Sequence, residues 1–413
     1  MSLRELQLAM RPLPFLDASA RSPGGVLELR TRLTRRLLVW HPDVIEEIFR
    51  LDQRLCHPGS RSLIPLLGRQ SLLWADGARH AAYRRVLGPP LRGRRLLDYH
   101  RIIAGTVDEA VDELIPGTVI TLSRWTRQLA LRIVARIILG RSDAELLAAF
   151  TAWIDDALGS RPRSLAYRWL RGGLPRSGDE LDRSLVRCAK DNPSAQPSTL
   201  AGLMLAADGP LGRLDDAELR DQLVSLLFAG HETTASAIAW TLYWLDRHEN
   251  LRHDVLAELV AAGDGSDAAQ VPLLQAVLQE VLRLTPPVPV GANRALAEDA
   301  VLGGRPLAAG TVLTPSSYLA HRRPEVFRHP HRFDPSRFLG DRVAAQHFFP
   351  FGGGSRRCLG NQLAQLEVRM VTAAVLRRRE WSCVNPGAGI PELRGHTMAP
   401  AARLRMRVLR CRE

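Results

Sequence analysis

Cysteine is scarce in this chain of 413 residues, and what is missing around it excludes several kinds of site. The five cysteines stand far apart, and no two of them form a C-x-x-C pair. Structural zinc sites and covalently attached c-type haem use that spacing, so neither is expected. An odd number of scattered cysteines fits a reducing compartment better than a disulfide framework. We therefore expect a cytoplasmic protein.

Long apolar stretches are missing as well. No run of apolar residues approaches the length of about 20 residues that a membrane-spanning helix needs. The first twenty residues carry charges at Arg4 and Glu5 and lack the apolar core of a secretory signal. These absences predict a chain without membrane anchor or signal peptide. With 46% hydrophobic residues, it still has ample material for a core.

Lysine is nearly absent, since Lys190 is the only one among 56 basic residues. Against 43 acidic residues, the formal net charge is +13. Such a balance is typical of proteins that bind nucleic acids or acidic proteins. The arginines are spread along the chain, without a zinc-finger spacing or an aromatic RNA-binding motif. We therefore expect an acidic protein partner rather than a nucleic acid.

The most informative stretch is the loop FGGGSRRCLG at residues 351–360. Three successive glycines cost backbone entropy and bury nothing, so they predict a backbone that passes close to a large flat group. Apolar residues at helical spacing follow over 363–376, which places Cys358 near a helix N-terminus. There the helix dipole and two adjacent arginines favour a thiolate, which is typical of an axial haem ligand. An ordinary buried cysteine and a cysteine hydrolase are the alternatives that the loop alone leaves open.

A second unusual stretch is 215–250, which has the pattern of one helix of more than thirty residues. It opens with Asp215 and Glu218 at the spacing of a capping box, and it would span roughly 50 Å. Its middle, AGHETT at residues 229–234, places a glycine and four polar residues inside an apolar helix. Glycine there costs about 1 kcal/mol relative to alanine, so the sequence favours a functional site. The alternative is a threonine bonded to the preceding turn and a glutamate at the surface.

A third pattern pairs a histidine with an arginine. His80 and Arg84 stand four residues apart, so one face of a helix would present both. Together they suit an anionic group such as a carboxylate. The alternative is a solvated basic face. Five further arginines stand nearby: Arg79, Arg85, Arg92, Arg94 and Arg95.

These stretches resemble the cytochrome P450 monooxygenases. The loop matches the signature F-x-x-G-x-R-x-C-x-G of that family at Phe351, Gly354, Arg356, Cys358 and Gly360. Three further motifs are similar, namely the H-x-x-x-R pair at 80 and 84, the helix motif at 229–234, and an E-x-x-R pair at Glu280 and Arg283. The resemblance runs from His80 to Ala364, with the motifs in the order of the family.

The resemblance implies a haem b cofactor with Cys358 as the axial ligand of its iron. It implies that Glu232 and Thr233 are an acid–alcohol pair that relays protons, and that the small residues of the same motif leave room for dioxygen and substrate. The haem propionates would be bound by four cationic side chains: His80, Arg84, Arg294 and Arg356. A buried structural network would consist of Glu280, Arg283 and Arg337.

The resemblance also implies one domain over residues 1–413, mainly α with small β-sheets, in the cytochrome P450 fold. Chain length alone would favour two or three domains. Local patterns predict strands before a helix in the first fifty residues, a helix over 178–190, a turn at Gly303 and Gly304 between short strands, and a closing strand pair at the C-terminus. Residues 160–199 are the expected lid of the substrate channel. The expected pocket wall, at 54–73, 226–229 and 287–290, is mostly apolar.

The implied activity is haem-thiolate monooxygenation, in which one oxygen atom of O2 enters a largely hydrophobic substrate. Hydroxylation or epoxidation of a secondary metabolite is the expected use. Electrons would come from a separate ferredoxin with its reductase or from a flavodoxin-type donor, because the sequence shows no fused electron carrier. The alternatives are a peroxide-driven peroxygenase, a fatty-acid hydroxylase, and a basic helical binding protein without haem.

Overall fold

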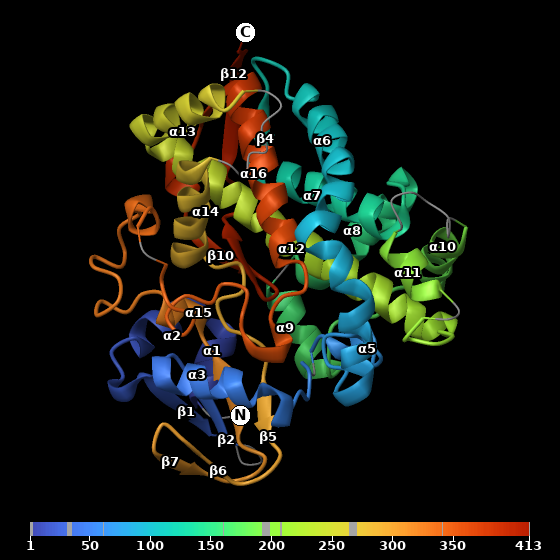
Figure 1. Ribbon diagram of the computed structural model, residues 1–413, viewed down its shortest axis with the longest axis vertical. Helices are drawn as coiled ribbons and strands as arrows, with labels where there is room; N and C mark the ends of the chain where they lie inside the picture. The colour runs from blue at the N-terminus through green and yellow to red at the C-terminus, as the bar shows by residue number, and fades with distance from the viewer. Residues whose placement is uncertain are drawn as a thin grey trace.

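Helices dominate the computed structural model, which describes residues 3–30, 35–60, 62–159, 161–191, 199–206, 209–263, 271–340 and 342–412. Most of the helices gather in one part of the molecule, and most of the strands lie at its other end (Figure 1). None of the described helices has both the length and the apolar character that crossing a membrane requires. The helical part contains α5 (Gly77–Leu87), α6 (Leu97–Asp112), α7 (Leu122–Leu139), α8 (Ala144–Leu158), α10 (Asp179–Lys190), α11 (Leu200–Leu205), α12 (Asp216–Arg247), α13 (Glu249–Ala261), α14 (Pro272–Leu284) and α16 (Asn361–Arg378).

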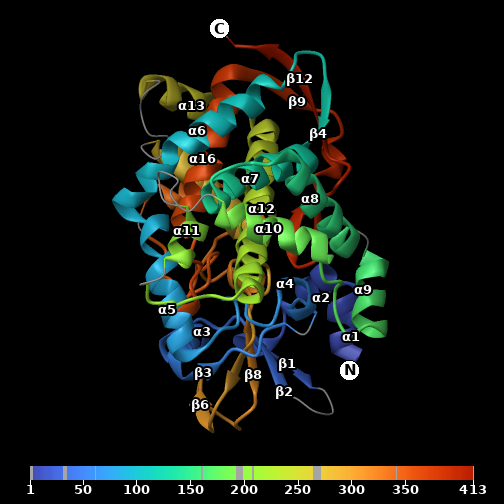
Figure 2. The ribbon, with the colours of Figure 1, turned by 90° about the vertical axis from the view of Figure 1, so that its right-hand side faces the viewer.

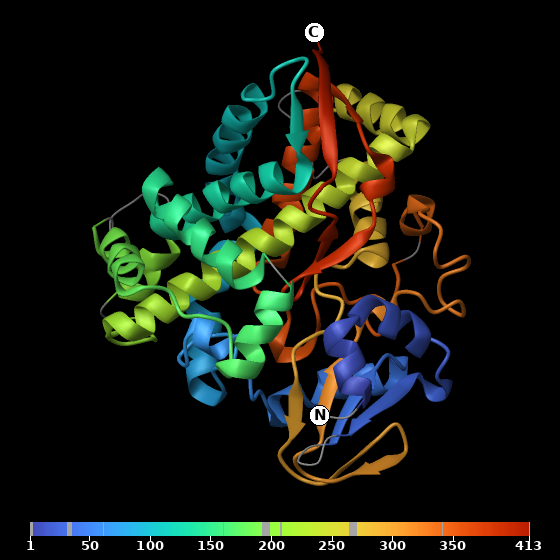
Figure 3. The same ribbon diagram turned by 180° about the vertical axis from the view of Figure 1, so that it is seen from behind.

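The central element is α12, a single helix of 32 residues that crosses the molecule (Figures 2 and 3). Its first turn is capped by Asp215, whose side chain accepts a hydrogen bond from the N–H of Glu218 at 2.7 Å. The predicted long helix and its capping residue are therefore confirmed. The helix packs most extensively against α7, and also against α14 and α16. It is buried along most of its length because helices surround it on several sides.

A five-stranded sheet forms the other end of the molecule, in the order β1–β2–β8–β5–β3. These strands are β1 (Val26–Arg30), β2 (Arg35–Val39), β3 (Leu55–Cys56), β5 (Arg294–Leu296) and β8 (Val312–Pro315). Since β3 pairs with β5, the sheet brings residues near position 55 next to residues near 295. The remaining strands form smaller sheets: β6 (Ala300–Leu302) with β7 (Arg305–Leu307), β10 (Pro391–Arg394) with β11 (Thr397–Pro400), and β4 (Val119–Thr121), β12 (Arg405–Cys411) and β9 (Arg379–Cys383) in that order.

The predicted strands, turns and helices are largely confirmed, with one clear omission at the N-terminus. The strands of the first forty residues are β1 and β2, followed by α3 (Pro42–Leu51), but α1 (Leu3–Met10) and α2 (Pro12–Ser19) precede them. Helix α2 has prolines at its first and third positions, where no intrahelical N–H is lost, so its sequence has the composition of a loop. The remaining helices are α4 (Ile64–Leu67), α9 (Arg161–Leu170) and α15 (Ser317–Ala320). Residues 160 and 192–198 of the expected lid lie outside the described residues.

The predicted Glu–Arg network is present, with Glu280 and Arg283 fully buried and Arg337 partly buried. Arg283 donates to both carboxylate oxygens of Glu280, at 2.6 and 2.8 Å, and Arg337 donates to the same carboxylate at 3.2 Å. Arg283 also donates to three backbone carbonyls, those of His321, Pro330 and Arg332. It therefore joins α14 to the irregular segment that leads into the cysteine loop.

Candidate functional site

The loop before α16 holds Cys358 in a defined backbone frame. A short 3-10 turn, Gly354–Arg356, precedes it, and the Cys358 N–H donates to the carbonyl of Phe351 at 2.9 Å. The Gly360 N–H donates to the Cys358 thiol. A donor aimed at the sulfur favours its charged form. The backbone is thus arranged for a sulfur that carries negative charge.

The electrostatics of Cys358 differ from the sequence-based expectation in one respect. The residue is open to solvent on one side, but it lies deep in the fold. Desolvation raises the pKa of the thiol, and this outweighs the lowering by the Gly360 N–H, Arg84 and Arg357. In the absence of a bound group, the surroundings therefore favour the neutral thiol, although the Gly360 N–H and the two arginines reduce that preference. A bound metal cation would secure the thiolate, because a metal-coordinating thiol loses its proton.

Two of the three loop glycines serve packing, which corrects the interpretation drawn from the sequence. A Cβ on Gly353 would lie 2.3 Å from the ring of Phe49, and a Cβ on Gly354 would lie 2.7 Å from the Cβ of Asp52. Of the three, Gly352 alone has no described atom within 4 Å of such a Cβ. The last turn of α3 and the residue after it lie directly on the loop, and no local sequence pattern indicates this contact. Gly353 and Gly354 therefore fit the loop against other protein atoms.

The predicted pair His80 and Arg84 lies on α5, next to the cysteine loop. Arg84 Nη1 donates to the carbonyl oxygen of Arg357 at 2.7 Å. Desolvation, followed by the positive charges of Arg356 and Arg84, lowers the pKa of His80 to about 4. At pH 7 His80 is therefore neutral. It offers a ligand a hydrogen bond rather than a charge.

The predicted cations Arg294 and Arg356 lie near each other, and each is paired with an aspartate. Arg294 is 4% exposed; its Nε pairs with Asp52, and its Nη1 donates to the carbonyl of Ala292 at 3.0 Å. Arg356 pairs through Nη2 with Asp76, while its Nε and Nη1 are buried and have no partner among the described residues. Unpaired buried donors are costly. These two fit the carboxylate of a ligand, such as a haem propionate.

No sequence pattern indicates three residues of this region: Asp52, His57 and Asp76. His57 is buried, with Nδ1 2.7 Å from an Asp76 oxygen and Nε2 3.4 Å from an Asp52 oxygen. Asp52 is separated by about 300 residues from Ser355 and Arg356, which it contacts. No motif spans such a distance. Only the pairing of β3 with β5 and the packing of α3 bring these residues together.

The middle of α12 separates the two side chains of the expected acid–alcohol pair. The hydroxyl of Thr233 donates to the carbonyl of Ala229 at 2.8 Å, and Thr233 lies on an accessible face. Glu232 is only 4% exposed and points into an ionic cluster, with His231 Nε2 and Arg394 Nε each 3.2 Å from its Oε1. The Thr233 hydrogen bond is thus the one that the structural alternative expects, whereas the burial of Glu232 contradicts a glutamate at the surface.

The glycine of the same motif serves helix packing. A Cβ on Gly230 would lie 2.6 Å from Cγ2 of Val134 on α7. Since α7 is the main packing partner of α12, a larger residue at 230 would push the two helices apart. The resemblance implies that small residues here leave room for dioxygen and substrate. For Gly230, the contact with α7 is the reason that the structure gives.

The ionic cluster keeps Glu232 charged. Burial alone would raise its pKa, but the hydrogen bond and charge of His231 and the charges of Arg394 and Arg127 lower it to about 2. Arg394 comes from β10 and Arg127 from α7, and both also pair with Asp155 of α8. A cavity of about 390 Å³ lies beside this cluster, between α2, α7, α12 and the β10–β11 hairpin, and Glu232 is part of its wall. The carboxylate therefore lies beside a cavity whose wall does not include Thr233.

Replacing Glu232 with glutamine is expected to change the pH dependence of stability. A carboxylate whose pKa falls from 4.5 to about 2 on folding stabilises the native state above pH 4.5, by about 3 kcal/mol. That contribution is lost as the pH falls from 4.5 towards 2. Urea unfolding of wild type and Glu232→Gln across this range should show a difference in unfolding free energy that shrinks with acidification. A difference that is constant with pH would contradict the ionic account. The exposed Glu392→Gln serves as control.

The segment expected to form part of the pocket wall is fixed to α12 by buried polar groups. The N–H of Gln70 donates to Asp221 at 3.0 Å, and that of Leu72 donates to Gln222 at 2.7 Å. The Gln222 side chain also donates to the carbonyl of Gln70, at 2.6 Å. Residue 61 of this segment lies outside the described residues. The described part is thus held against the first half of α12.

Comparisons with known proteins identify the family. The model of the family described as Cytochrome P450 matches residues 179–403. Cytochrome P450 135A1 of Mycobacterium tuberculosis is 33% identical over 413 residues, covering 96% of this chain and 90% of that protein. Cyclooctat-9-en-7-ol 5-monooxygenase of Streptomyces melanosporofaciens is 31% identical, covering 90% of this chain and 86% of that protein.

Solved structures agree on the fold. The retinoic acid-bound cyanobacterial CYP120A1 superposes with a TM-score of 0.83 at 24% identity, covering 99% of this chain and 96% of that one. A zebrafish cytochrome P450 with abiraterone gives a TM-score of 0.80 at 23% identity, covering 97% and 99%. The mainly helical fold with small sheets is thereby confirmed. The chain belongs to the cytochrome P450 family of haem-thiolate oxidoreductases.

Proposed function

We propose that this chain is a single-domain monooxygenase that binds haem b with Cys358 as the axial ligand of the iron. It inserts one oxygen atom of O2 into a largely hydrophobic organic substrate. The observation that supports this most directly is the donor set around the loop. Cys358 receives the Gly360 N–H, and Arg356 offers two buried N–H groups without a partner among the described residues.

Each residue of the site has a distinct part in this proposal. When bound, the haem supplies the redox chemistry that activates O2. Cys358 holds the cofactor from one side, while Arg356 and Arg84 bind its carboxylates as cations and His80 binds them as a neutral donor. Arg294 supports them through its position beside Arg356, because Asp52 occupies its Nε. These groups fix the orientation of the cofactor.

Proton delivery is assigned to Glu232 and Thr233. Glu232 exchanges protons at the cavity, and the Thr233 hydroxyl holds a proton on an accessible face of α12. Because their side chains diverge, transfer between them requires the Glu232 carboxylate to leave Arg394 and His231. The ionic cluster thereby sets how often the carboxylate is free to act.

The substrate is proposed to be a hydrophobic secondary metabolite that is hydroxylated or epoxidised. The relative from Streptomyces melanosporofaciens is named for oxidation of cyclooctat-9-en-7-ol, and it covers most of this chain. The expected wall segments at 226–229 and 287–290 are mostly apolar, which favours an apolar ligand. Spin-state titration with a panel of terpenoid, polyketide and fatty-acid ligands would separate a metabolite oxygenase from a fatty-acid hydroxylase.

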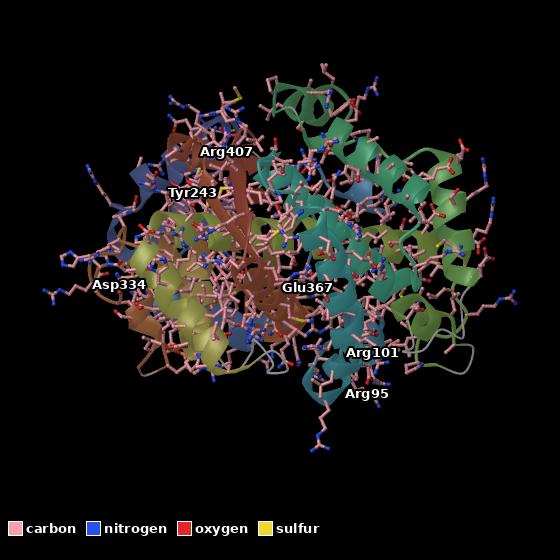
Figure 4. The ribbon with its side chains drawn as sticks, turned by 90° about the horizontal axis from the view of Figure 1, so that it is seen from above. Arg95, Arg101, Tyr243, Asp334, Glu367 and Arg407 are labelled. Atoms are coloured by element: carbon pink, nitrogen blue, oxygen red, sulfur yellow. The ribbon has the colours of Figure 1, made fainter. Side chains whose placement is uncertain are left out.

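The electron donor is proposed to be an acidic ferredoxin with its reductase, or a flavodoxin-type protein. Exposed arginines lie on the cysteine loop and on segments beside it. The Gly93 N–H donates to the Gln362 side chain at 2.8 Å, and this bond holds the turn before α6 against α16. The exposed arginines are Arg85, Arg92, Arg94, Arg95 and Arg357. Figure 4 shows Arg95 and Arg101 at the outer edge of the molecule. An acidic surface would complement this patch.

Reversing the charge at Arg94 and Arg95 is expected to slow reduction by an acidic donor about tenfold or more at low ionic strength. The loss should diminish as salt is added, because the attraction is screened. Stopped-flow reduction by a ferredoxin measures it. Arg407→Glu, an exposed residue far from Arg95 in Figure 4, is the control and should leave the rate unchanged. Equal effects of both changes would contradict docking at this patch.

The function itself is tested with the purified full-length chain. The reduced carbon monoxide complex should absorb at about 450 nm, as thiolate-bound haem does. Product formation should require O2 and an electron donor. Turnover with peroxide but none with O2 and reductase would identify a peroxygenase instead. A colourless, folded protein would favour a binding protein without haem and overturn the proposal.

A further inference from the structure

An ionic chain that no sequence motif indicates lies behind the proposed cofactor site. It consists of Asp52, His57 and Asp76, and it contacts both Arg294 and Arg356. The three residues come from the turn after α3, the loop after β3 and the start of α5, respectively. These three residues therefore join segments that carry separate parts of the site.

Asp52 connects the five-stranded sheet to the cysteine loop. Its carboxylate is 0% exposed and pairs with Arg294 of β5. It also accepts hydrogen bonds from the Ser355 hydroxyl at 2.6 Å and from the Arg356 N–H at 3.0 Å. One carboxylate thus fixes Arg294 and the backbone two residues before Cys358 relative to each other.

His57 and Asp76 extend the connection to α5. Asp76 accepts from the His57 N–H at 3.0 Å and lies 2.7 Å from His57 Nδ1. Its carboxylate pairs with the Arg356 guanidinium. Asp76 is also the residue directly before α5, the helix that carries His80 and Arg84. Arg294 and Arg356 are therefore paired with these three residues, and the helix that carries His80 and Arg84 begins next to them.

The negative charges in this chain persist despite burial. Desolvation alone would raise the pKa of Asp52, but the hydrogen bond from His57, the charge of Arg294 and the bond from Ser355 lower it well below its usual range. A buried ionised carboxylate is costly unless it is paired and hydrogen-bonded, and Asp52 has four such partners. Two aspartates thus place permanent negative charge beside the cations.

We propose that Asp52, His57 and Asp76 are positioning residues for the haem, which hold Arg294 and Arg356 in place and lower the reduction potential of the bound iron. The inference rests on the proposed haem site at Cys358. Groups that orient the direct ligands of a metal or cofactor commonly change its affinity 10–100-fold when mutated. Negative charge near the haem disfavours the reduced iron, because reduction adds an electron to the site.

The rival explanation is that Asp52, His57 and Asp76 only stabilise the fold, as the Glu280–Arg283 pair does. The two roles separate when a charge is removed with little change in shape. Asp52→Asn keeps an acceptor for Ser355 and the Arg356 N–H but removes the charge. A suitable control is Asp182→Asn, since Asp182 is also a buried aspartate paired with a buried arginine, Arg220, at 2.8 Å. That pair lies on α10 and α12, among a different set of residues.

The experiment uses the haem-loaded full chain and two readouts besides activity. Transfer of haem to excess apomyoglobin should be about 10–100-fold faster for Asp52→Asn than for wild type. The midpoint potential, measured by spectroelectrochemistry, should move upward. Asp182→Asn should lower thermal stability without changing either readout. In an Arg294→Gln background, the further effect of Asp52→Asn on haem transfer should shrink, because the arginine that it holds is gone.

The possible results distinguish the inference from the function on which it rests. If wild type lacks haem or the band near 450 nm, the proposed function fails. If wild type has both, but Asp52→Asn and Asp182→Asn match in haem transfer and potential, the inference is overturned. Should Asp52→Asn fail to fold, Asp76→Asn replaces it, because Asp76 is half-exposed. It should shift both readouts in the same direction, and unchanged readouts would reject the inference.

Discussion

Replacement of Cys358 with alanine is expected to abolish the band near 450 nm of the reduced carbon monoxide complex and to reduce O2-dependent product formation to background. Thiolate ligation gives that band, and alanine offers no ligand. Of the described cysteines, Cys358 is the one that lies on the loop before α16 with a backbone N–H and two arginines around its sulfur. The spectrum of the dithionite-reduced, carbon monoxide-saturated protein measures the first effect.

Two controls separate loss of the ligand from loss of the fold. Cys411→Ala changes an exposed cysteine on β12 and should keep both the band and the activity. The circular dichroism of Cys358→Ala should match that of wild type, since the residue is open to solvent on one side and its removal creates little core cavity. A Cys358→Ala protein that keeps the band near 450 nm would refute the assignment of the axial ligand.

The parts of the site that lie close together in sequence are predictable from sequence. The loop at 351–360 and the motif at 229–234 are such parts, because glycines and polar residues in an apolar helix violate local propensity and so attract attention. The capping of α12 by Asp215 is likewise a local pattern. Helix α2 is the opposite case, because its prolines at the first turn give it the appearance of a loop.

The parts that depend on long-range contacts are not predictable in this way. Glu232 and its partner Arg394 are 162 residues apart, and Asp52 and Arg294 are 242 residues apart. Neither Arg394 nor Asp52 belongs to a motif. The reasons for Gly230, Gly353 and Gly354 are also long-range, since Val134 and the segment at Phe49 and Asp52 are the groups that exclude a side chain. Sequence indicates where glycine is needed, and the fold shows what it accommodates.

Arg283→Met is expected to lower the free energy of unfolding by about 3–5 kcal/mol, which is the usual cost of removing one partner from a buried ion pair. Arg283 and Glu280 are both 0% exposed, so the remaining carboxylate would lose its main partner inside the protein. Three carbonyls would lose their donor as well, those of His321, Pro330 and Arg332. Arg337, 3.2 Å from Glu280, would compensate in part.

The same change should loosen the cysteine loop. The carbonyl of His321 accepts from Arg283, and the ring of His321 accepts from the Phe349 N–H at 2.9 Å, two residues before the loop begins. Loss of Arg283 therefore frees the segment that leads to Cys358, so the variant should bind haem more weakly as well as unfold at lower urea. Equilibrium urea denaturation and the haem content after gel filtration measure the two effects.

A matched control is Arg410→Met, which removes an arginine from an ion pair with Glu380 at 2.7 Å on the surface of β9 and β12. Because Arg410 is largely exposed, its loss should cost less than about 1 kcal/mol and leave the haem content unchanged. Arg283→Lys should resemble Arg283→Met rather than wild type, since one ammonium group cannot reach the carboxylate and three carbonyls at once. If Arg283→Lys were as stable as wild type, the five hydrogen bonds of Arg283 would not be what holds α14 to the segment before the cysteine loop.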